Sequence, residues 1–160
     1  MLQIQRAACA AVVPVLLNPA PAIPLPAEAY TGLTHLIVNE TEAEILAGPT
    51  DINDTLETRC KSWAQSFLAR GVHNVLITLG GRGVYYATNA GLAGRVAAAP
   101  TTVVDTTAAG DTFVGAYALE MVVNVGKAEI GEAVARANRA AAKTVAKRGA
   151  QDSIPWRDEL

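Results

Sequence analysis

The sequence has few of the residues from which disulfides and metal sites are built. Its 160 residues include two cysteines, Cys9 and Cys60, and neither lies in a cluster with histidine. This usage is more typical of reduced thiols in the core of a cytoplasmic protein than of a disulfide or a metal pair. The two histidines, His35 and His73, are isolated beside expected strands. We therefore expect structural or surface roles for both.

An excess of charge of one sign is also missing. Thirteen Lys and Arg residues stand against fifteen Asp and Glu residues, for a net charge of −2. Such a chain has no basic field to attract nucleic acid or an anionic membrane, and we expect neither as a partner. Hydrophobic residues make up 51% and charged residues 18%, as in a globular domain without a disordered tail. This length suits a single domain with one core.

A long apolar run that could span a membrane is absent as well, although residues 1–22 come nearest. Arg6 precedes an apolar stretch over residues 7–17, and Ala20-Pro21-Ala22 follows it. That order is similar to a weak secretory signal peptide. The stretch is too short, and too rich in proline near its end, for a membrane span. A helix to about Ala11 and a buried strand over residues 12–17 would suit the same residues.

What the sequence does contain is an alternation of short β-branched runs with longer helical periods. This alternation predicts βαβ units around a parallel sheet, an α/β fold. We expect strands at residues 12–17, 34–38 and 74–79, and an appended antiparallel hairpin at 84–87 and 92–98. We expect helices at residues 42–46 with Thr41 as N-cap, 54–70, 111 to about 125 ending at Gly126, and 128 to about 147.

The helix expected over residues 54–70 has the clearest amphipathic pattern. Its apolar residues fall on one face at helical spacing, and Gly71 is a stop signal. That face consists of Leu56, Cys60, Trp63, Phe67 and Leu68.

The ten residues 104–113 carry the strongest chemical signal. Val103 and Val104 predict the end of a strand, a turn of small residues follows, and Asp111 stands where an apolar helix begins. A helix N-terminus has unpaired N–H groups and a partial positive charge, so this loop suits a phosphate or a developing anion. Asp111 would then take a proton from an attacking hydroxyl. On spacing alone, Asp111 could equally be a helix N-cap.

Other polar residues follow the expected strands. They are Asn18, Asn39, residues 78–83 and residues 105–111. In open α/β sheets ligands bind at the carboxyl ends of the strands. Because capping preferences alone rarely produce such convergence, it favours a ligand site over a simple N-cap role for Asp111.

The loop resembles the C-terminal signature of the ribokinase-like (PfkB-type) sugar kinases, which reads Asp-Thr-x-[Ala/Gly]-[Ala/Gly]-Gly-Asp. Four further segments are similar to the ribokinase branch of that family, in the family's order: residues 17–22, 39–44, 76–83 and 149–156. The resemblance implies a three-layer α/β fold with a mostly parallel sheet flanked by helices. It also favours the helix and strand over the signal peptide in residues 1–22, and hence a cytoplasmic protein.

The resemblance is confined to the second half of the family, whose members are about twice as long. It therefore implies that residues 1–160 form one partial C-terminal domain. The family's first strands, its lid and its Gly-Gly-Lys sugar-binding segment have no counterpart in this sequence.

By resemblance, the activity is transfer of the γ-phosphoryl group of ATP to the 5-hydroxyl of D-ribose, giving D-ribose 5-phosphate. Asp111 would be the general base and would contact the sugar, while Ala108, Ala109 and Gly110 form the anion hole. The nucleotide would contact Asn39, Thr78, Leu79, Gly80, Gly81, Arg82, Gly83, Gly110 and Asn138. The glycines also suit an ordinary turn, Arg82 an exposed position, and Asn138 an exposed helix face.

Two metal ions are implied in the same way. Asn39 and Glu42 match the family's Asn-x-x-Glu element and would order Mg²⁺ indirectly, although Glu42 also suits the first turn of its helix. An activating K⁺ would be held largely by carbonyl oxygens, and for Lys147 only by the carbonyl. The matching positions are Asp105, Thr107, Thr144, Lys147, Gly149 and Ser153.

Two other outcomes are compatible with the sequence. The chain could be a non-catalytic nucleotide-binding fragment, or one that associates with another chain. A half-sheet exposes an unpaired edge and apolar patches, so we expect marginal stability or self-association, for example as a homodimer. It could also be another sugar or nucleoside kinase of the family, because the residues that select the sugar are absent.

Overall fold

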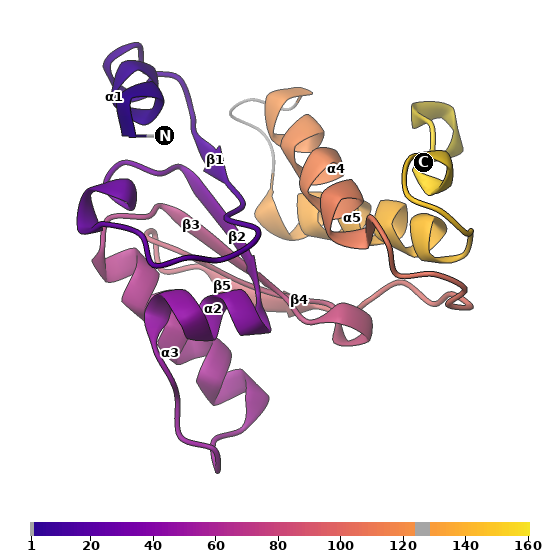
Figure 1. The fold of residues 1–160 in the computed structure, drawn as a ribbon, viewed down its shortest axis with the longest axis horizontal. Helices are drawn as coiled ribbons and strands as arrows, with labels where there is room; N and C mark the ends of the chain where they lie inside the picture. Colours follow the sequence, from indigo (N-terminus) through magenta and orange to yellow (C-terminus); the bar gives the residue numbers. More distant parts are fainter. Residues whose placement is uncertain (1, 124–128) are drawn as a thin grey trace. The chain divides into compact units, whose positions relative to one another are not determined.

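The structure, a computed structural model, describes residues 2–123 and 129–160. The chain folds into two compact units. The first consists of Met1–Leu79 and Tyr85–Gly94, and the second of Gly80–Val84 and Arg95–Leu160. Figure 1 shows the helices and strands of both.

One five-stranded sheet, in the order β1-β2-β3-β4-β5, runs through the molecule. The strands are β1 (Leu16–Leu17), β2 (His35–Asn39), β3 (Asn74–Thr78), β4 (Val84–Thr88) and β5 (Ala93–Val96). β1, β2 and β3 are parallel. The links before and after β4 are too short for a parallel crossover, so β4 and β5 add an antiparallel hairpin. The predicted α/β class and the hairpin are confirmed.

The core of the first unit lies between this sheet and two helices, α2 (Glu40–Ala47) and α3 (Leu56–Ala69), which cover one face (Figure 1). The amphipathic prediction for α3 is confirmed, because Cys60, Trp63 and Phe67 are buried and its other two apolar residues are half-buried. The ring of Phe67 stacks on that of Tyr30 at 5.9 Å between centroids. Four of the five residues of β2 are buried, as expected for a central strand.

The N-terminal segment departs from the predicted strand. Helix α1 (Leu2–Ala10) is followed by a turn, and β1 consists of Leu16–Leu17 alone. The strand predicted over residues 12–17 is wrong in its first part, because that backbone still completes the turn of α1. Val12 donates its N–H to the Cys9 carbonyl at 3.1 Å, and Val13 donates to the Ala8 carbonyl at 2.8 Å.

The second unit is built on helices α4 (Ala109–Val123) and α5 (Ile130–Val145), which pack against each other. The buried hydroxyls of Thr112 and Thr144 are 3.0 Å apart and hydrogen-bonded. Tyr117 is fully buried, and this burial raises the pKa of its hydroxyl. The ends that we predicted at Gly126 and Ala128 lie outside the described residues.

The strand predicted to end at Val103 and Val104 is wrong. In the described part of the chain, residues 97–105 belong to no strand. The N–H groups of Val104 and Asp105 both donate to the carbonyl of Val145, at 2.7 and 3.1 Å. This segment is therefore pinned to the end of α5 rather than to a neighbouring strand.

None of the described helices combines the length and the hydropathy that crossing a membrane would need.

The buried histidine His35 makes the stability of the first unit dependent on pH. Burial, and to a smaller extent the nearby His73, together lower the pKa of His35 to about 4. Between pH 6.5 and 4 the unfolded chain therefore binds a proton that the folded chain does not. We expect the free energy of unfolding to fall by about 3 kcal/mol as the pH decreases through that window.

Urea unfolding of the wild type and of His35→Gln at several pH values measures this effect. The difference between the two proteins isolates His35 from the carboxylates that titrate in the same range. His73→Gln, an exposed position, should keep most of the pH dependence. Parallel curves for the wild type and His35→Gln between pH 4 and 6.5 would contradict the prediction.

Candidate functional site

Polar side chains gather at the carboxyl ends of three neighbouring parallel strands in the first unit. Asn18 follows β1, Asn39 is the last residue of β2 and Thr78 the last of β3. Asn39 and Thr78 are paired in the register of the two strands. The Asn18 amide donates to the Ile37 carbonyl at 2.9 Å. These three residues lie at the carboxyl ends of strands, as predicted. The prediction that residues 105–111 also follow a strand is wrong, because the described residues 97–105 belong to no strand.

Asn39 and Glu42 form a reciprocal cap at the start of α2. Asn39 Oδ1 accepts the Glu42 N–H at 2.9 Å, and Glu42 Oε2 accepts the Asn39 N–H at 2.8 Å. The N-cap is therefore Asn39, and the prediction of Thr41 is wrong because Thr41 lies inside the first turn. Glu42 is 9% exposed, and its Oε1 has no hydrogen bond among the described residues. One carboxylate oxygen thus stays available at the edge of the sheet.

The segment from Thr78 to Gly83 crosses from the first unit into the second. Leu79 is buried, and Gly80–Arg82 form a 3₁₀ turn. Gly83 has φ +91°, and a Cβ there would overlap the carbonyl oxygen of Val96. Gly83 is thus required by backbone packing, whereas the space around Gly80 and Gly81 is open. Arg82 is exposed, as one of the two interpretations expected.

The loop before α4 is organised by the carboxylate of Asp105. Its Oδ1 accepts the hydroxyl of Thr107 at 2.7 Å and the N–H of Thr107 at 2.9 Å. Its Oδ2 accepts the N–H of Gly149 at 3.0 Å. These hydrogen bonds, led by the Thr107 hydroxyl, lower the pKa of Asp105 to about 2. The ionised carboxylate therefore joins the loop to the C-terminal segment.

The loop leaves several N–H groups open at the N-terminus of α4. Ala108 has φ +62°, which is uncommon for a residue with a side chain. Ala109 donates to the Thr106 carbonyl at 3.3 Å. The N–H groups of Ala108, Gly110 and Asp111 make no hydrogen bond to any residue that the structure describes. Together with the helix dipole, they form a site suited to an anion.

Asp111 is not the N-cap of this helix. α4 begins at Ala109, so Asp111 is inside the first turn, and its exposed carboxylate has no hydrogen-bond partner among the described residues. The N-cap alternative is therefore wrong. A carboxylate that is free beside an anion site can accept a proton from a reacting hydroxyl.

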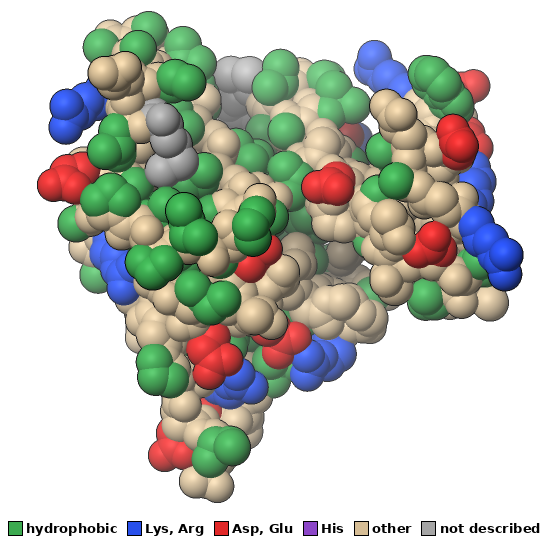
Figure 2. Space-filling model, viewed as in Figure 1, with side chains coloured by type: hydrophobic (Ala, Val, Ile, Leu, Met, Phe, Trp, Pro, Cys, Tyr) green, Lys and Arg blue, Asp and Glu red, His purple; other side chains and the backbone are tan. Residues whose placement is uncertain are grey.

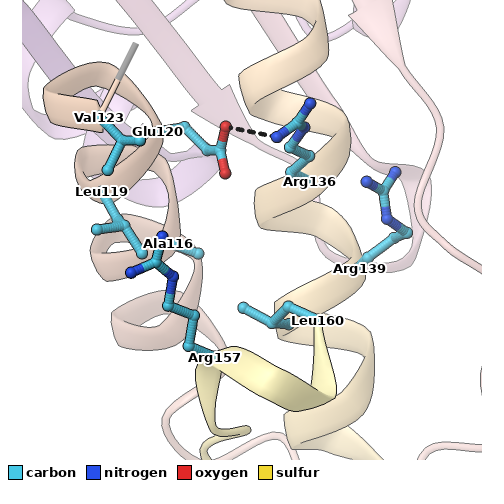
Figure 3. A pocket seen from close by; sticks show the side chains of 8 residues that line it. All are labelled: Ala116, Leu119, Glu120, Val123, Arg136, Arg139, Arg157 and Leu160. Atoms are coloured by element: carbon cyan, nitrogen blue, oxygen red, sulfur yellow. Dashed lines mark hydrogen bonds and ion pairs between the residues drawn. The ribbon is translucent and has the colours of Figure 1, made fainter.

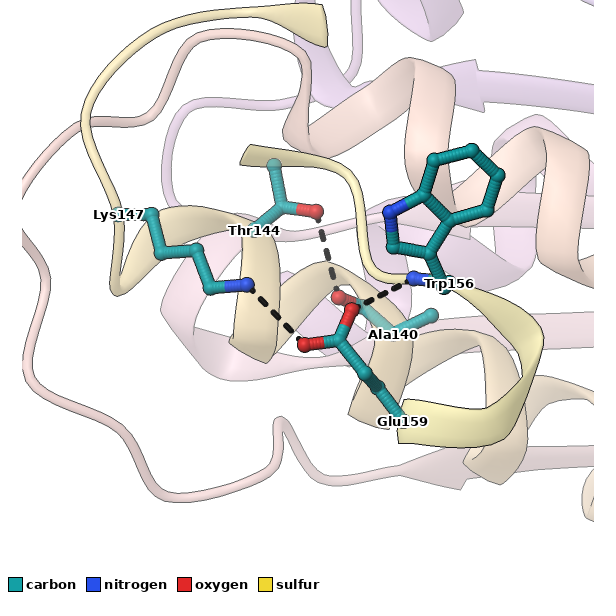
Figure 4. Close-up of polar contacts among 5 residues, drawn as sticks. All are labelled: Ala140, Thr144, Lys147, Trp156 and Glu159. Carbon is teal, nitrogen blue, oxygen red and sulfur yellow. Dashed lines mark hydrogen bonds and ion pairs between the residues drawn. The ribbon is translucent and has the colours of Figure 1, made fainter. Parts of the chain in front are cut away.

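The segment after α5 is held by Glu159 (Figure 4). Its carboxylate accepts the Trp156 N–H at 2.7 Å and pairs with Lys147 Nζ at 3.3 Å. The hydrogen bond from the Trp156 N–H, and to a smaller extent the one from Lys147, lowers the pKa of Glu159. Ser153 is fully buried, and its hydroxyl donates to the Ala150 carbonyl at 2.7 Å. These contacts fold the segment back on the residues that follow α5, and the N–H of Gly149 joins it to Asp105.

The residues matched to the K⁺ site fit that ion unequally. The carbonyls of Lys147, Gly149 and Ser153 receive no hydrogen bond from the described residues, so these hard oxygen donors are available. The Lys147 ammonium is directed to Glu159 instead (Figure 4). The Thr144 carbonyl accepts the Lys147 N–H at 3.0 Å, and the Thr144 hydroxyl is bound to Thr112. Thr144 thus fits least well.

Asn138 lies on α5 but not on its exposed face. It is 8% exposed, and its amide donates to the Ala97 carbonyl at 3.1 Å. In the part of the chain that the structure describes, no three His, Cys, Asp or Glu side chains are grouped so as to hold a metal.

The structure also contains a hollow between α4 and α5 that is lined by Arg136, Arg139 and Arg157. The sequence analysis did not predict it, because these residues are scattered along the chain and match no motif.

Comparison with known proteins assigns the chain to a family. The model of the pfkB family of carbohydrate kinases matches residues 1–157. This chain belongs to that family. The ribokinase of Staphylococcus aureus is 42% identical over 148 residues, which cover 92% of this chain and 47% of that protein. The ribokinase of Schizosaccharomyces pombe is 40% identical over 144 residues, which cover 89% of this chain and 44% of that protein.

A solved structure of the pfkB fold extends the similarity to three dimensions. The Arabidopsis thaliana ribokinase complexed with ribose and ATP matches with a TM-score of 0.87 and 35% identity. The match covers 98% of this chain and 49% of that one. The chain thus spans about half the length of the relatives that it matches.

Asp105→Asn should loosen the loop of this pfkB chain without unfolding it. The amide cannot accept all three hydrogen bonds as an ionised carboxylate does, so we expect the amides of Thr107 and Gly149 to lose protection against hydrogen exchange. Exchange measured by NMR tests this. Asp158→Asn makes the same chemical change at an exposed residue and should leave both amides unchanged. Equal protection in all three proteins would contradict the role given to Asp105.

Proposed function

We propose that this chain performs the phosphoryl transfer of a ribokinase, from ATP to the 5-hydroxyl of D-ribose. The observation that carries the proposal is the start of α4, where open N–H groups and the unengaged Asp111 carboxylate occur together. The similarity to a ribokinase complexed with ribose and ATP supports the same substrates. Such a site offers charge stabilisation and a proton acceptor, which are the two needs of the reaction.

In the proposed step, the 5-oxygen of ribose forms a bond to the γ-phosphorus of ATP. The bond from that phosphorus to the β–γ bridging oxygen breaks, and ADP leaves. The hydroxyl proton passes to the carboxylate of Asp111. The N–H groups of Ala108 and Gly110 stabilise the transferring group, while the N–H of Ala109 already donates to Thr106.

The nucleotide would lie along the carboxyl ends of β2 and β3 and the turn that follows. Asn39, Thr78, Leu79 and residues 80–83 would contact it, with Asn138 against the base. Asn138 would act there through the part of its side chain that does not bind Ala97. Gly80 and Gly81 have open space above their backbone, as close approach of a ligand requires.

Mg²⁺ would be ordered near Asn39 and Glu42, whose Oε1 is available. Bound there, the ion supplies charge neutralisation for the phosphates. The carbonyls of Lys147, Gly149 and Ser153, with Asp105 and Thr107, would hold K⁺ and so stiffen the loop. We further propose that the chain works in the cytoplasm in D-ribose catabolism, without a nucleic acid or membrane partner.

ADP release by the purified chain, with MgATP and K⁺ and with or without D-ribose, tests the proposal. We expect ribose-dependent turnover, and Asp111→Asn should lower kcat by at least about 10²-fold because the general base is lost. The KM for ATP should change little, since Asp111 is proposed to act on the sugar hydroxyl.

Asp158→Asn is the matched control and should keep the wild-type rate, because its exposed carboxylate is not part of the site. If the wild type releases no ADP in response to ribose, the proposal fails. Ribose-dependent turnover that persists in Asp111→Asn would show that another group accepts the proton.

A second candidate function, association with another chain, is favoured by the N-terminal segment. Ile4, Val12 and Val13 are 76%, 89% and 55% exposed. They precede β1, the outermost strand of the sheet, beyond which the described residues place no further strand. An exposed strand edge beside apolar side chains is a surface for pairing between chains.

We therefore expect the purified chain to self-associate at micromolar concentration, as measured by light scattering. Ile4→Lys should shift the distribution towards monomer by placing a charge on the apolar surface. Ile52→Lys changes an equally apolar and exposed residue in the loop before α3 and should leave the distribution unchanged. A wild type that is monomeric at all concentrations would contradict this.

A further inference from the structure

A hollow with a volume of about 430 Å³ lies between α4, α5 and the 3₁₀ helix Arg157–Glu159 (Figure 3). All of its lining residues belong to the second unit. Three are arginines: Arg136 and Arg139 extend from α5, and Arg157 lies beside α4 (Figure 3). A volume of this size is within the range of small-molecule sites.

The charges around the hollow do not cancel. Arg136 pairs with Glu120 at 3.1 Å across the two helices, and among the described residues Glu120 is the only carboxylate side chain that lines the hollow. Arg139 and Arg157 have no hydrogen bond or ion pair from their guanidinium groups to any residue that the structure describes. The described lining side chains therefore carry a net charge of +2, and the α-carboxylate of the lining residue Leu160 reduces the excess to one positive charge.

The opposing wall is apolar. Ala116, Leu119 and Val123 succeed one another on one side of α4 at helical spacing. Leu119 is 40% and Val123 57% exposed, so this stripe has free surface for contact. On the face drawn in Figure 2, hydrophobic side chains are interspersed with charged ones. A cationic rim with an apolar wall suits an anion that carries an organic body.

The hollow is separate from the site at the start of α4. Asp111 and Glu120 are nine positions apart on the same helix, and at about 100° per residue their side chains leave it on opposite sides. On α5, Asn138 is buried, whereas Arg136 and Arg139 are exposed. A ligand of the hollow would therefore not occupy the anion site of the proposed transfer.

We propose that this hollow binds a small organic phosphate monoester. A phosphate monoester carries about −1.5 to −2 charges at neutral pH and is attracted by the positive excess, to which Arg139 and Arg157 contribute two guanidinium groups without an ion pair among the described residues. Guanidinium groups bind phosphate oxygens in pairs of parallel hydrogen bonds, and arginine is the residue best suited to that geometry. The organic part of the ester would lie against Leu119 and Val123. Inorganic phosphate has no such part.

An NMR titration of the methyl groups of Leu119 and Val123 tests the proposal in the complete 160-residue chain. Phenyl phosphate is the probe, since it combines a dianion with an apolar body. We expect saturable shifts of both methyl signals. Inorganic phosphate should bind at least about threefold more weakly, because it lacks contact with the apolar wall. Succinate, a dianion of different geometry, should also bind more weakly.

The double variant Arg139→Gln, Arg157→Gln should weaken the binding of phenyl phosphate by at least about tenfold. Arg6→Gln removes an exposed arginine from the other unit and should leave it unchanged. The amide spectrum of each variant reports whether it is folded, and Arg139→Gln alone serves if the double variant is not. Shifts confined to residues 105–111, equal binding of inorganic phosphate or succinate, or full binding by the arginine variant would each overturn the proposal.

Discussion

The loop before α4 depends on one carboxylate, that of Asp105. Asp105 binds Thr107 through one oxygen and Gly149 through the other, so residues far apart in the sequence meet at a single side chain. The loop geometry follows from this contact, because Thr107 is fixed immediately before Ala108 takes its positive φ. With the loop set in this way, the first N–H groups of α4 stay open. The anion site is thus a consequence of how Asp105 is held.

In the first unit, polar groups are held at the edge of a buried sheet. Parallel pairing of β2 and β3 brings Asn39 and Thr78 into register, and the cap between Asn39 and Glu42 ties α2 to the same edge. This cap satisfies helix donors and leaves one carboxylate oxygen available. Structural and functional interpretations of Asn39 and Glu42 are therefore compatible, since the same hydrogen bonds orient both side chains.

Much of the fold could be predicted because its signals are local. The apolar face of α3 and the small residues before α4 each act within one or two turns of chain. The wrong predictions occur where a hydrogen bond to a residue far away in the sequence determines the local structure. Val103 and Val104 have the residue type of a strand, yet the Val145 carbonyl takes the N–H of Val104 and of Asp105. The spacing of residues near Val104 gives no sign of this hydrogen bond to Val145. The basic hollow was missed for the same reason, as α5 and residues 157–160 supply its charges.

The features of the proposed site that this chain contains are grouped in one of its two units. The anion site, the proposed base and the C-terminal segment all lie in the second unit, and Asp105 ties that segment to the loop. The contacts of Asp105 that set this geometry are made within that unit. Selection of the sugar and exclusion of water need surfaces that enclose the substrate, and such surfaces come from further elements of a fold. The residues on which the proposed phosphoryl transfer rests, the open N–H groups and Asp111 at the start of α4, therefore lie together in the second unit.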